Sequence, residues 1–369
     1  MNTSLFFQIA LSNLKGIGDS TAKLLLSYCG SADAIFKTSA AKLSKIPGIG
    51  PSTINAIKKN IEAFEIAENE IQFIEKENIK TFFILDENYP KKLKYCNDAP
   101  ILLYGKGNLD LNPSKLISIV GTRHATEYGK LITENLIADL AEYDVSIISG
   151  LAYGIDIAAH KSALKHNLPT IGVLAHGLHT IYPAQHRSIA EKMQLKGGIL
   201  TEYAFKTNAD KGNFPKRNRI VAGMTDATIV VESAISGGAL ITAELANNYN
   251  KDVLAFPGNV DQEFSAGCNK LIRENKAHLL RSANDLIEFL GWADLKEKQP
   301  KNAIQKDLFF EFSKEENAIF DQFKTKPKIQ LDELSYLSLL PISTLSATLF
   351  SLEMKGYIKS LPGKMYEWI

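Results

Sequence analysis

The sequence has little of what several protein classes require. Its 369 residues include only three cysteines, Cys29, Cys96 and Cys268, too few and too widely spaced for a disulfide framework or a cysteine-rich zinc site. The sequence contains no uninterrupted run of about 18 apolar residues, the length needed to span a bilayer. The N-terminal residues lack both the basic start and the small-residue cleavage site of a secretory signal. We therefore expect a soluble cytoplasmic protein with no membrane association.

An excess of charge of one sign is also missing. The chain has 42 Lys and Arg against 41 Asp and Glu, a net charge of +1, so a polyanionic partner must be met by a local cationic cluster. With 45% hydrophobic and 22% charged residues, the composition is that of an ordinary globular protein. The length allows two or three domains.

The N-terminal region contains an internal repeat. Residues 14–25 and 46–57 share an apolar-x-Gly-Ile-Gly-x-Ser-Thr pattern, 32 residues apart, which marks duplicated supersecondary units. The pattern resembles a tandem helix-hairpin-helix (SAM-like) domain, a family whose hairpins bind nucleic-acid phosphates through N–H groups at a helix start. Equally open is a purely structural role, in tight turns or a protein contact surface, for Gly16, Gly18, Gly48 and Gly50.

From Lys115 the pattern changes to short β-branched runs separated by helical periods, after a connector that contains one strand at 101–104. This predicts an α/β fold with a Rossmann-like, mainly parallel sheet. Strands are expected at 116–120, 145–149, 170–174, 198–200, 228–231 and 253–256. Helices are expected at 126–143, 154–166, 185–196, 218–224, 239–249 and 267–276. Ligands of such sheets bind beyond the carboxyl ends of the strands.

The loop after the first predicted strand of this core, residues 121–129, lacks the Gly-x-Gly-x-x-Gly of a dinucleotide site, and no P-loop motif occurs in the chain. We expect no cofactor. Gly121 and Thr122 instead offer backbone and hydroxyl donors, and Arg123 offers a planar fork for a phosphate oxygen. The alternative is that Arg123 only pairs with a carboxylate.

A second loop segment, residues 211–219, carries four positive charges and no negative one. A cationic groove with an aromatic ring suits single-stranded nucleic acid, because unpaired bases are free to stack. The candidates are Lys211, Phe214, Lys216, Arg217, Asn218 and Arg219. Alternatives are a solvated basic loop, or pairing of the two arginines with Glu202 or Glu232. Because positions 217 and 219 cannot both face one groove, we expect one arginine to be structural.

A third loop follows the predicted strand at 228–231 and opens a helix. Its residues Ser236, Gly237 and Gly238 make a plausible anion cradle of backbone N–H groups.

Together these loops resemble the DNA-processing protein A family, also called DprA or Smf. The matching stretches lie in the order found in that family and extend over about 160 residues, namely 121–123, 149–160, 214–223, 230–233, 236–243, 256–258 and 267–272. The hairpin domain in front and a small domain behind also match the family arrangement.

The resemblance implies a cytoplasmic protein that binds and protects incoming single-stranded DNA, forms homodimers, and loads the RecA recombinase during natural transformation. The family's DNA pocket is built around residues matched here by Arg123, Phe214, Arg217, Asn218 and Arg219, with Lys211 at a position that often contacts DNA.

The sequence departs from the family pattern at several places. Tyr153 stands where members often carry Arg, and the segments 175–179 and 182–186 gain histidines. Three imidazoles within eleven residues, His176, His179 and His186, could in principle bind zinc, but their spacing matches no standard ligand pattern. We expect no metal site, and instead polar lining of the groove or plain surface. Arg187 adds a possible phosphate contact.

Residues 291–317 are polar and weakly periodic, which predicts a linker. Beyond it, helices expected at 329–334 and 341–355 and a hairpin at 356–369 form a winged-helix pattern. The segment 342–354 contains no Lys or Arg, so sequence-specific duplex reading is not expected, and a protein contact or a modest assisting role in DNA binding fits better. The predicted domains are 1–80, 81–290 and 318–369.

No catalytic constellation is predicted. Asp156 and His160 share a helix face, but capping or core hydrogen bonding suits them better than acid–base work, and Glu232 is expected to anchor the basic loop. The alternative to a binding protein is a Rossmann-like nucleotide phosphoribohydrolase of the lysine-decarboxylase-like kind, whose glycine-rich loop and glutamate are partly echoed by residues 236–244. The hairpin domain and the basic loop have no use in that reaction.

Overall fold

The computed structural model describes residues 3–292, 312–324, 326–361 and 363–368. Contacts divide the chain into two compact units, Met1–Ala293 and Asp294–Ile369. Most of the linker predicted at 291–317 lies outside the described residues. The domain boundaries predicted within the first unit stay a prediction.

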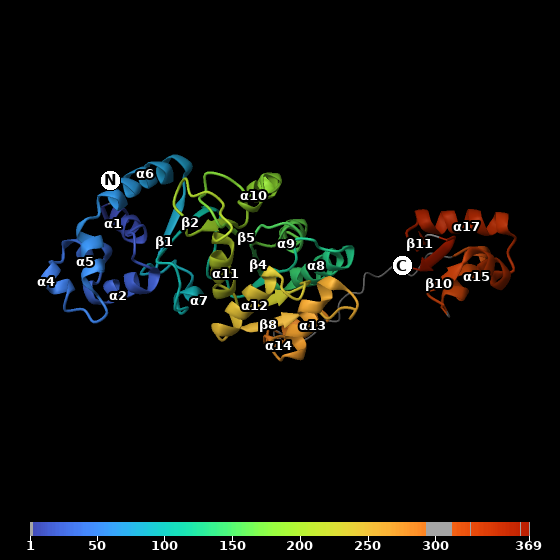
Figure 1. Ribbon diagram of the computed structural model, residues 1–369. Coiled ribbons are helices and arrows are strands. Elements are labelled where there is room, and N and C mark those ends of the chain that lie inside the picture. The colour runs from blue at the N-terminus through green and yellow to red at the C-terminus, as the bar shows by residue number, and fades with distance from the viewer. Residues whose placement is uncertain (1–2, 293–311, 325, 362, 369) are drawn as a thin grey trace. The chain divides into compact units, whose positions relative to one another are not determined.

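The first unit begins with a helical region that contains both copies of the repeat (Figure 1). Gly16 and Gly48 adopt φ of 78° and 83°, a left-handed backbone that glycine accepts without strain. Each following Gly-Ile-Gly ends at the N-cap of a helix, Gly18 for α2 and Gly50 for α5. The tandem hairpins are therefore confirmed. The helices are α1 (Thr3–Ser12), α2 (Asp19–Cys29), α3 (Ala32–Lys37), α4 (Ala40–Leu43), α5 (Pro51–Lys58) and α6 (Ile61–Glu77).

The described residues beyond α6 form a sheet of nine strands in the order β1-β2-β6-β5-β4-β3-β7-β8-β9. The neighbouring strands β6, β5, β4, β3, β7, β8 and β9 run parallel to one another. Strand β2 is antiparallel to both β1 and β6. The bounds are β1 (Lys80–Phe83), β2 (Leu102–Gly107), β3 (Leu116–Val120), β4 (Ser146–Ser149), β5 (Thr170–Val173), β6 (Gly198–Thr201), β7 (Ala227–Val230), β8 (Asp252–Ala255) and β9 (His278–Leu279). The strand order reverses between β3 and β7, which is where open α/β sheets bind ligands.

Helices cover both faces of the sheet (Figure 1). Because side chains alternate along a strand, Ile117 and Ile119 of β3 pack with α8, α9 and α14, whereas Val120 packs with α11, α12 and α13. The hydrophobic core that contains Val120 is continuous with the apolar residues of α1 to α6. The helices are α7 (Lys91–Lys94), α8 (Glu127–Leu140), α9 (Ile155–Lys165), α10 (Arg187–Met193), α11 (Asn213–Gly223), α12 (Gly238–Asn248), α13 (Ala266–Arg273) and α14 (Ala283–Phe289), with short 3-10 turns at 141–143, 184–186 and 263–265.

The predicted α/β core is confirmed, and the six predicted strands lie within one residue of the observed bounds. The prediction for α11 was wrong at its start, because the helix begins at Asn213 rather than Asn218. Pro215 lies in the first turn of α11, where a missing backbone N–H costs nothing. Most of the segment predicted as a basic loop is therefore helical. Strands β1 and β9 and helix α14 were not predicted.

The second unit folds as the predicted winged helix. Its helices are α15 (Lys314–Phe323), α16 (Leu331–Ser338) and α17 (Ile342–Met354), and β10 (Lys328–Gln330), β11 (Ile358–Leu361) and β12 (Met365–Trp368) form an antiparallel sheet. Its core contains Ile319, Leu334, Leu345 and Leu349. The helix predicted at 329–334 was wrong at both ends, because β10 occupies its first residues and α16 runs on to Ser338. Helix α15 was not predicted.

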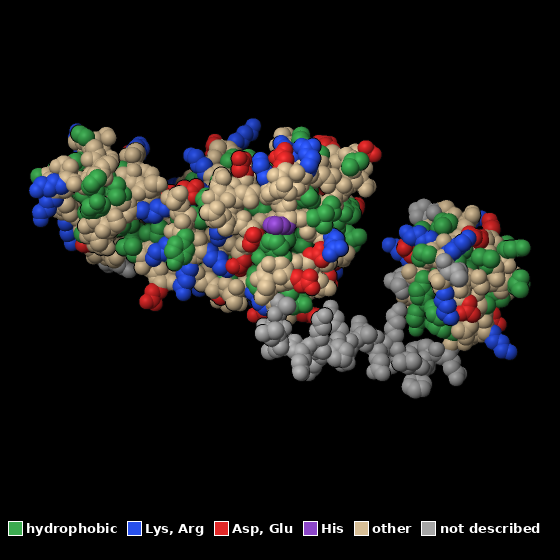
Figure 2. Space-filling model, turned by 90° about the horizontal axis from the view of Figure 1, so that it is seen from below, with side chains coloured by type: hydrophobic (Ala, Val, Ile, Leu, Met, Phe, Trp, Pro, Cys, Tyr) green, Lys and Arg blue, Asp and Glu red, His purple; other side chains and the backbone are tan. Residues whose placement is uncertain are grey.

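In the described part of the chain, no single helix is long and apolar enough to cross a bilayer. Helices α16 and α17 together reach that length and apolar composition, but they are bent by 108° relative to each other. On the face of the first unit drawn in Figure 2, Lys and Arg side chains are interspersed with Asp and Glu. This agrees with the net charge of +1.

Candidate functional site

A groove of about 630 Å³ lies where the strand order reverses, beyond the carboxyl ends of β3, β4 and β7. We call it the strand-end groove. Four stretches of chain line it: residues 120–124 after β3, 150–156 before α9, 211–221 of α11 and its approach, and 234–242 at the start of α12. Tyr182 and Phe264 complete its wall.

The groove brings together most of the residues that the sequence nominated. Those that line it are Gly121, Thr122, Arg123, Lys211, Phe214, Arg217, Asn218, Ser236, Gly237 and Gly238. Lys216, Arg219 and Arg187 do not line it. The nominated residues that line the groove come from three segments, 121–123, 211–218 and 236–238, which are far apart in sequence. They meet because each segment follows a parallel strand of one sheet.

The rim of the groove combines a cation with aromatic rings. The Arg123 guanidinium lies 5.4 Å from the centroid of the Phe214 ring, within the range of a cation–π contact. The Tyr182 ring lies 5.9 Å from that of Phe214 and is half exposed. Arg123 makes no hydrogen bond or ion pair with a described residue, so its five N–H donors face solvent. The predicted alternative, a carboxylate partner for Arg123, is not observed among these residues.

Backbone N–H groups converge on the same groove. Helices α11 and α12 begin after Gly212 and Gly237 without a side-chain cap and without an acidic residue in the first turn. The first N–H groups of a helix have no intrahelical acceptor and carry the positive end of its dipole. The start of α12 therefore favours an anion in the groove. At α11 the N–H groups of Gly212 and Asn213 already donate to Asp210, and Pro215 has no N–H.

Arg217 lies at the floor of the groove, and its side chain is buried. Its Nη1 donates to the carbonyl oxygens of Gly150, at 2.6 Å, and Val173. Burial lowers the pKa of Arg217 to about 10, and the nearby Asp156 carboxylate opposes that shift, so Arg217 stays charged at neutral pH. A Cβ at position 150 would lie 2.5 Å from this guanidinium, which only glycine avoids. Arg217 thus braces the strand ends.

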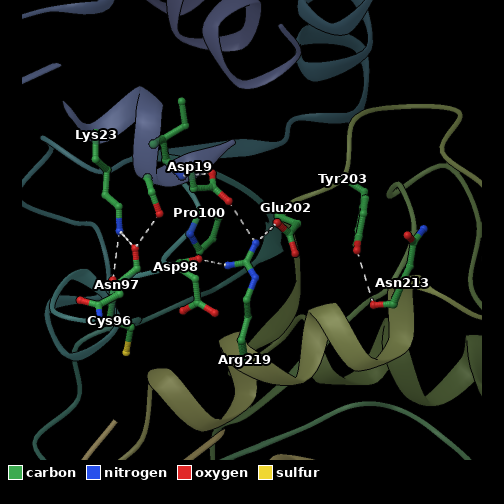
Figure 3. Close-up of polar contacts among 12 residues, drawn as sticks. Asp19, Lys23, Cys96, Asn97, Asp98, Pro100, Glu202, Tyr203, Asn213 and Arg219 are labelled. Atoms are coloured by element: carbon green, nitrogen blue, oxygen red, sulfur yellow. Dashed lines mark hydrogen bonds and ion pairs between the residues drawn. The ribbon is translucent and has the colours of Figure 1, made fainter. Parts of the chain in front are cut away.

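Arg219 does not line the groove and points toward Asp19 and Glu202 instead (Figure 3). Its Nη1 donates to the Asp98 carbonyl at 2.6 Å, and its Nη2 pairs with the carboxylates of Asp19, at 3.3 Å, and Glu202. Only 12% of its side chain is exposed. The alternative that Arg219 pairs with Glu202 is therefore confirmed. Lys216 and Arg187 are exposed outside the groove.

The three histidines do not converge. His176 and His186 are buried, and their Nδ1 atoms lie 2.9 Å and 2.8 Å from the carbonyl oxygens of Gly177 and Leu151. His179 packs edge-on against Phe205, beside a different hollow. Within the described ranges no group of three His, Cys, Asp or Glu side chains is placed to hold a metal ion. The expected alternatives, groove lining or plain surface, were both wrong for the two buried histidines.

The acid–base candidates have structural partners. Asp156 accepts hydrogen bonds from the backbone N–H groups of Gly150 and Ala152, and His160 Nδ1 lies 2.7 Å from the Thr170 hydroxyl. Burial lowers the pKa of His160 to about 3, so its ring is neutral.

Glu232 accepts from both the backbone N–H and the hydroxyl of Thr126, and Thr126 caps α8. The prediction that Glu232 anchors the basic loop at residues 211–219 was wrong, because its carboxylate binds Thr126 at the start of α8 instead.

Sequence reasoning missed three ring-bearing residues of the groove: His124, Tyr182 and Phe264. His124 and Phe264 face each other with ring centroids 6.4 Å apart. His124 directly follows Arg123, which was the available signal. Phe264 lies in a 3-10 turn far along the chain, with no motif around it.

Three family models match the chain. The model described as DNA recombination-mediator protein A matches residues 80–291. A SAM-like helix-hairpin-helix tandem matches residues 8–63, and the DprA winged helix domain matches residues 299–364.

Known proteins are similar over comparable lengths. Protein Smf of Synechocystis sp. is 32% identical over 99% of both chains, and DNA processing protein DprA of Streptococcus pneumoniae is 40% identical over 56% of this chain and 73% of its own. The solved structure of DprA from Streptococcus pneumoniae matches with a TM-score of 0.67 at 32% identity, covering 77% of this chain and 97% of that one. A solved structure on the single-stranded DNA binding mode of DprA from Helicobacter pylori matches with a TM-score of 0.52 at 30% identity, over 57% and 95%.

Proposed function

Because the chain belongs to the DNA recombination-mediator protein A family, also called DprA or Smf, we propose that it binds single-stranded DNA in the strand-end groove. One observation carries the proposal. Arg123, without a hydrogen-bond or ion-pair partner among the described residues, lies over the Phe214 ring beside two uncapped helix starts.

The phosphates of the strand are the first target of this groove. Arg123 and Lys211 supply charge, and the start of α12 supplies backbone N–H donors. Asp156 is the single carboxylate among the described residues that line the groove, and it is buried against backbone N–H groups. An anionic backbone therefore meets little repulsion.

The aromatic rim favours a single strand over a duplex. Phe214 and the half-exposed Tyr182 offer ring faces to unpaired bases, and such stacking is worth about 1–3 kcal/mol per base. A duplex keeps its bases stacked on one another and cannot use these rings. The solved structure of the Helicobacter pylori relative, which concerns single-stranded DNA binding, supports the same reading.

The finer functions belong to the same proposal. As a recombination mediator, the protein protects incoming single strands in the cytoplasm, acts as a homodimer, and loads RecA during natural transformation. The family's description as a recombination mediator supports this part. A test is RecA-dependent ATP hydrolysis on DNA covered with a single-strand binding protein, which the chain should accelerate. If the chain does not accelerate this ATP hydrolysis, the RecA-loading part of the proposal is contradicted, while the DNA-binding part is not.

A nucleotide-hydrolysing role is less well supported. Glu244, which echoes the glutamate of that alternative, is exposed on α12 and does not line the groove. Asp156 is held by two backbone N–H groups and by the charge of Arg217. A binding role uses the groove as it stands.

Fluorescence anisotropy with a labelled oligothymidylate, its duplex and a salt series tests the groove. Arg123→Ala should weaken binding about tenfold or more, because a charge-assisted hydrogen bond is worth about 1.5–3 kcal/mol, and should reduce the salt slope by about 0.7. Phe214→Leu should weaken binding without changing the slope, because it removes a ring but no charge.

Arg273→Ala is the matched control, since Arg273 is exposed on α13 and lies outside the groove. Wild-type binding that is insensitive to both groove substitutions would refute the proposal. In that event, release of base from a mononucleotide is the next assay.

A further inference from the structure

The segment that carries the Lys211, Phe214 and Arg217 wall of the groove is held at both ends by the N-terminal helices. We call residues 202–219 the basic segment; it runs from the end of β6 through the first turns of α11. Its groove residues are Lys211, Phe214, Pro215, Arg217 and Asn218. The two attachments come from α2 and α6, which are separated from each other by the second hairpin.

The attachment at the end of the basic segment is a charge cluster on the first hairpin (Figure 3). Asp19, the first residue of α2, accepts from Arg219 Nη2 at 3.3 Å and from the Ile101 backbone N–H at 3.1 Å. One turn later, Lys23 Nζ donates to the carbonyl oxygens of Cys96, at 3.0 Å, and Asn97, at 2.5 Å. The side chains of Asp19 and Lys23 therefore dock one side of α2 against the core, whereas Gly16 and Gly18 before the helix stay exposed.

The attachment at the beginning of the basic segment is made by α6. The buried Glu70 carboxylate accepts from the Phe205 backbone N–H at 2.7 Å, and the Phe73 and Phe205 rings stack with centroids 4.0 Å apart. The next residue, Lys206, has a φ of 67°, a left-handed conformation that a lysine rarely adopts. These contacts with α6 fix the path of the chain toward the groove.

The second hairpin lacks the residues that make the first attachment. In the repeat, Pro51 and Asn55 stand where the first copy has Asp19 and Lys23. Neither side chain can form the ion pair with Arg219 that Asp19 forms. The two copies share their backbone geometry, and the docking side chains distinguish them.

We propose that the N-terminal helical region acts as a scaffold that positions the basic segment for DNA, with Asp19 and Glu70 as its positioning residues. This rests on the proposed function of the strand-end groove. It assigns the first hairpin to protein docking, and it assigns Arg219 to holding α11 rather than to contact with a phosphate.

The sign of the expected effect separates this role from a direct one. Asp19 and Glu70 are acidic, so removing either side chain should not weaken binding of a polyanion if electrostatics alone acted. Positioning predicts the opposite, because a loosened segment must be ordered when DNA binds. Glu68→Ala is the matched control, because Glu68 is an exposed acid on the same helix as Glu70.

The experiment measures oligothymidylate binding of the full chain across a salt series, with hydrogen exchange of peptides from residues 202–219. Asp19→Ala and Glu70→Ala should each weaken binding about tenfold, the factor given by about 1.4 kcal/mol, with an unchanged salt slope and faster exchange in the basic segment. Glu70→Gln should restore affinity, since its amide oxygen can accept the Phe205 N–H without a charge. Thermal melts select a temperature at which all variants are folded.

Asp19→Ala and Glu70→Ala binding as tightly as Glu68→Ala would overturn the inference. Failure of the proposed function looks different: Arg123→Ala would then bind like wild type whatever Asp19→Ala does.

Discussion

Glu70→Gln should make the stability of the protein depend less on pH. Only 3% of Glu70 is exposed. Burial raises the pKa of its carboxyl from 4.5 to about 7, although the hydrogen bond from Phe205 acts the other way. The folded chain therefore holds this proton more tightly than the unfolded chain does. Its stabilising contribution is fully present below about pH 4.5 and is lost as the pH rises through about 7.

The magnitude follows from that change in pKa. A carboxyl whose pKa rises from 4.5 to about 7 on folding loses about 3 kcal/mol of stability between acid and alkaline solution. Glutamine does not titrate, so Glu70→Gln lacks this loss. The difference in free energy of unfolding, variant minus wild type, should therefore increase by about 3 kcal/mol between about pH 4.5 and about pH 8. Burial also raises the pKa of Glu202 to about 7, but that group titrates in both proteins and cancels in the difference.

Urea unfolding of both proteins at several pH values, followed by far-UV circular dichroism, measures this difference. Glu68→Gln is the control, because it makes the same substitution at an exposed glutamate on the same helix. Parallel stability–pH curves for Glu70→Gln and wild type would refute the reasoning, since they would mean that Glu70 keeps its ordinary pKa in the folded protein.

Three further substitutions test the groove and its supports. Gly154→Ala should lower the free energy of unfolding by at least about 2 kcal/mol and weaken oligothymidylate binding, because Gly154 has a φ of 77° and its added Cβ would overlap the Thr122 carbonyl oxygen; thermal melts and anisotropy check this. Arg217→Met should cost about 3–5 kcal/mol in urea unfolding, because it leaves buried Asp156 without its opposite charge; a cost below about 1 kcal/mol would contradict the bracing role. Thr126→Ala should cost about 1 kcal/mol or more, since Thr126 caps α8 and also donates to Glu232; an unchanged melting temperature would count against that cap.

The strands of the core were predictable because each is short, β-branched and buried on both faces. Such runs leave a signal that does not depend on distant residues. The edge strand β9 has two exposed residues and leaves no such pattern. The start of α11 was missed because Phe214-Pro215 resembles a turn, while a proline in a first helical turn is equally acceptable.

The groove was predictable at the level of segments but not of every side chain. The carboxyl ends of parallel strands lie at one edge, so loops after β3 and β7 had to meet there. Pairing of an arginine with Glu202 was among the predicted alternatives, but Asp19, the other partner that orients Arg219, is 200 residues away in sequence. Two positions along a helix rotate a side chain by about 200°, which explains why one arginine faces the groove floor and the other the N-terminal helices.

Helix starts that look alike in the sequence serve different purposes here, and only tertiary structure separates them. Helices α2 and α12 both begin after a glycine N-cap without a side-chain cap. At α2, Asp19 and Lys23 bind residues 96–101 and Arg219, so the helix start joins two parts of the protein. At α12, Ser236 and Gly238 border an open groove with Arg123 nearby. The glycine before each helix leaves its start without a side-chain cap, and the side chains beside it decide whether the helix docks against protein or borders a groove.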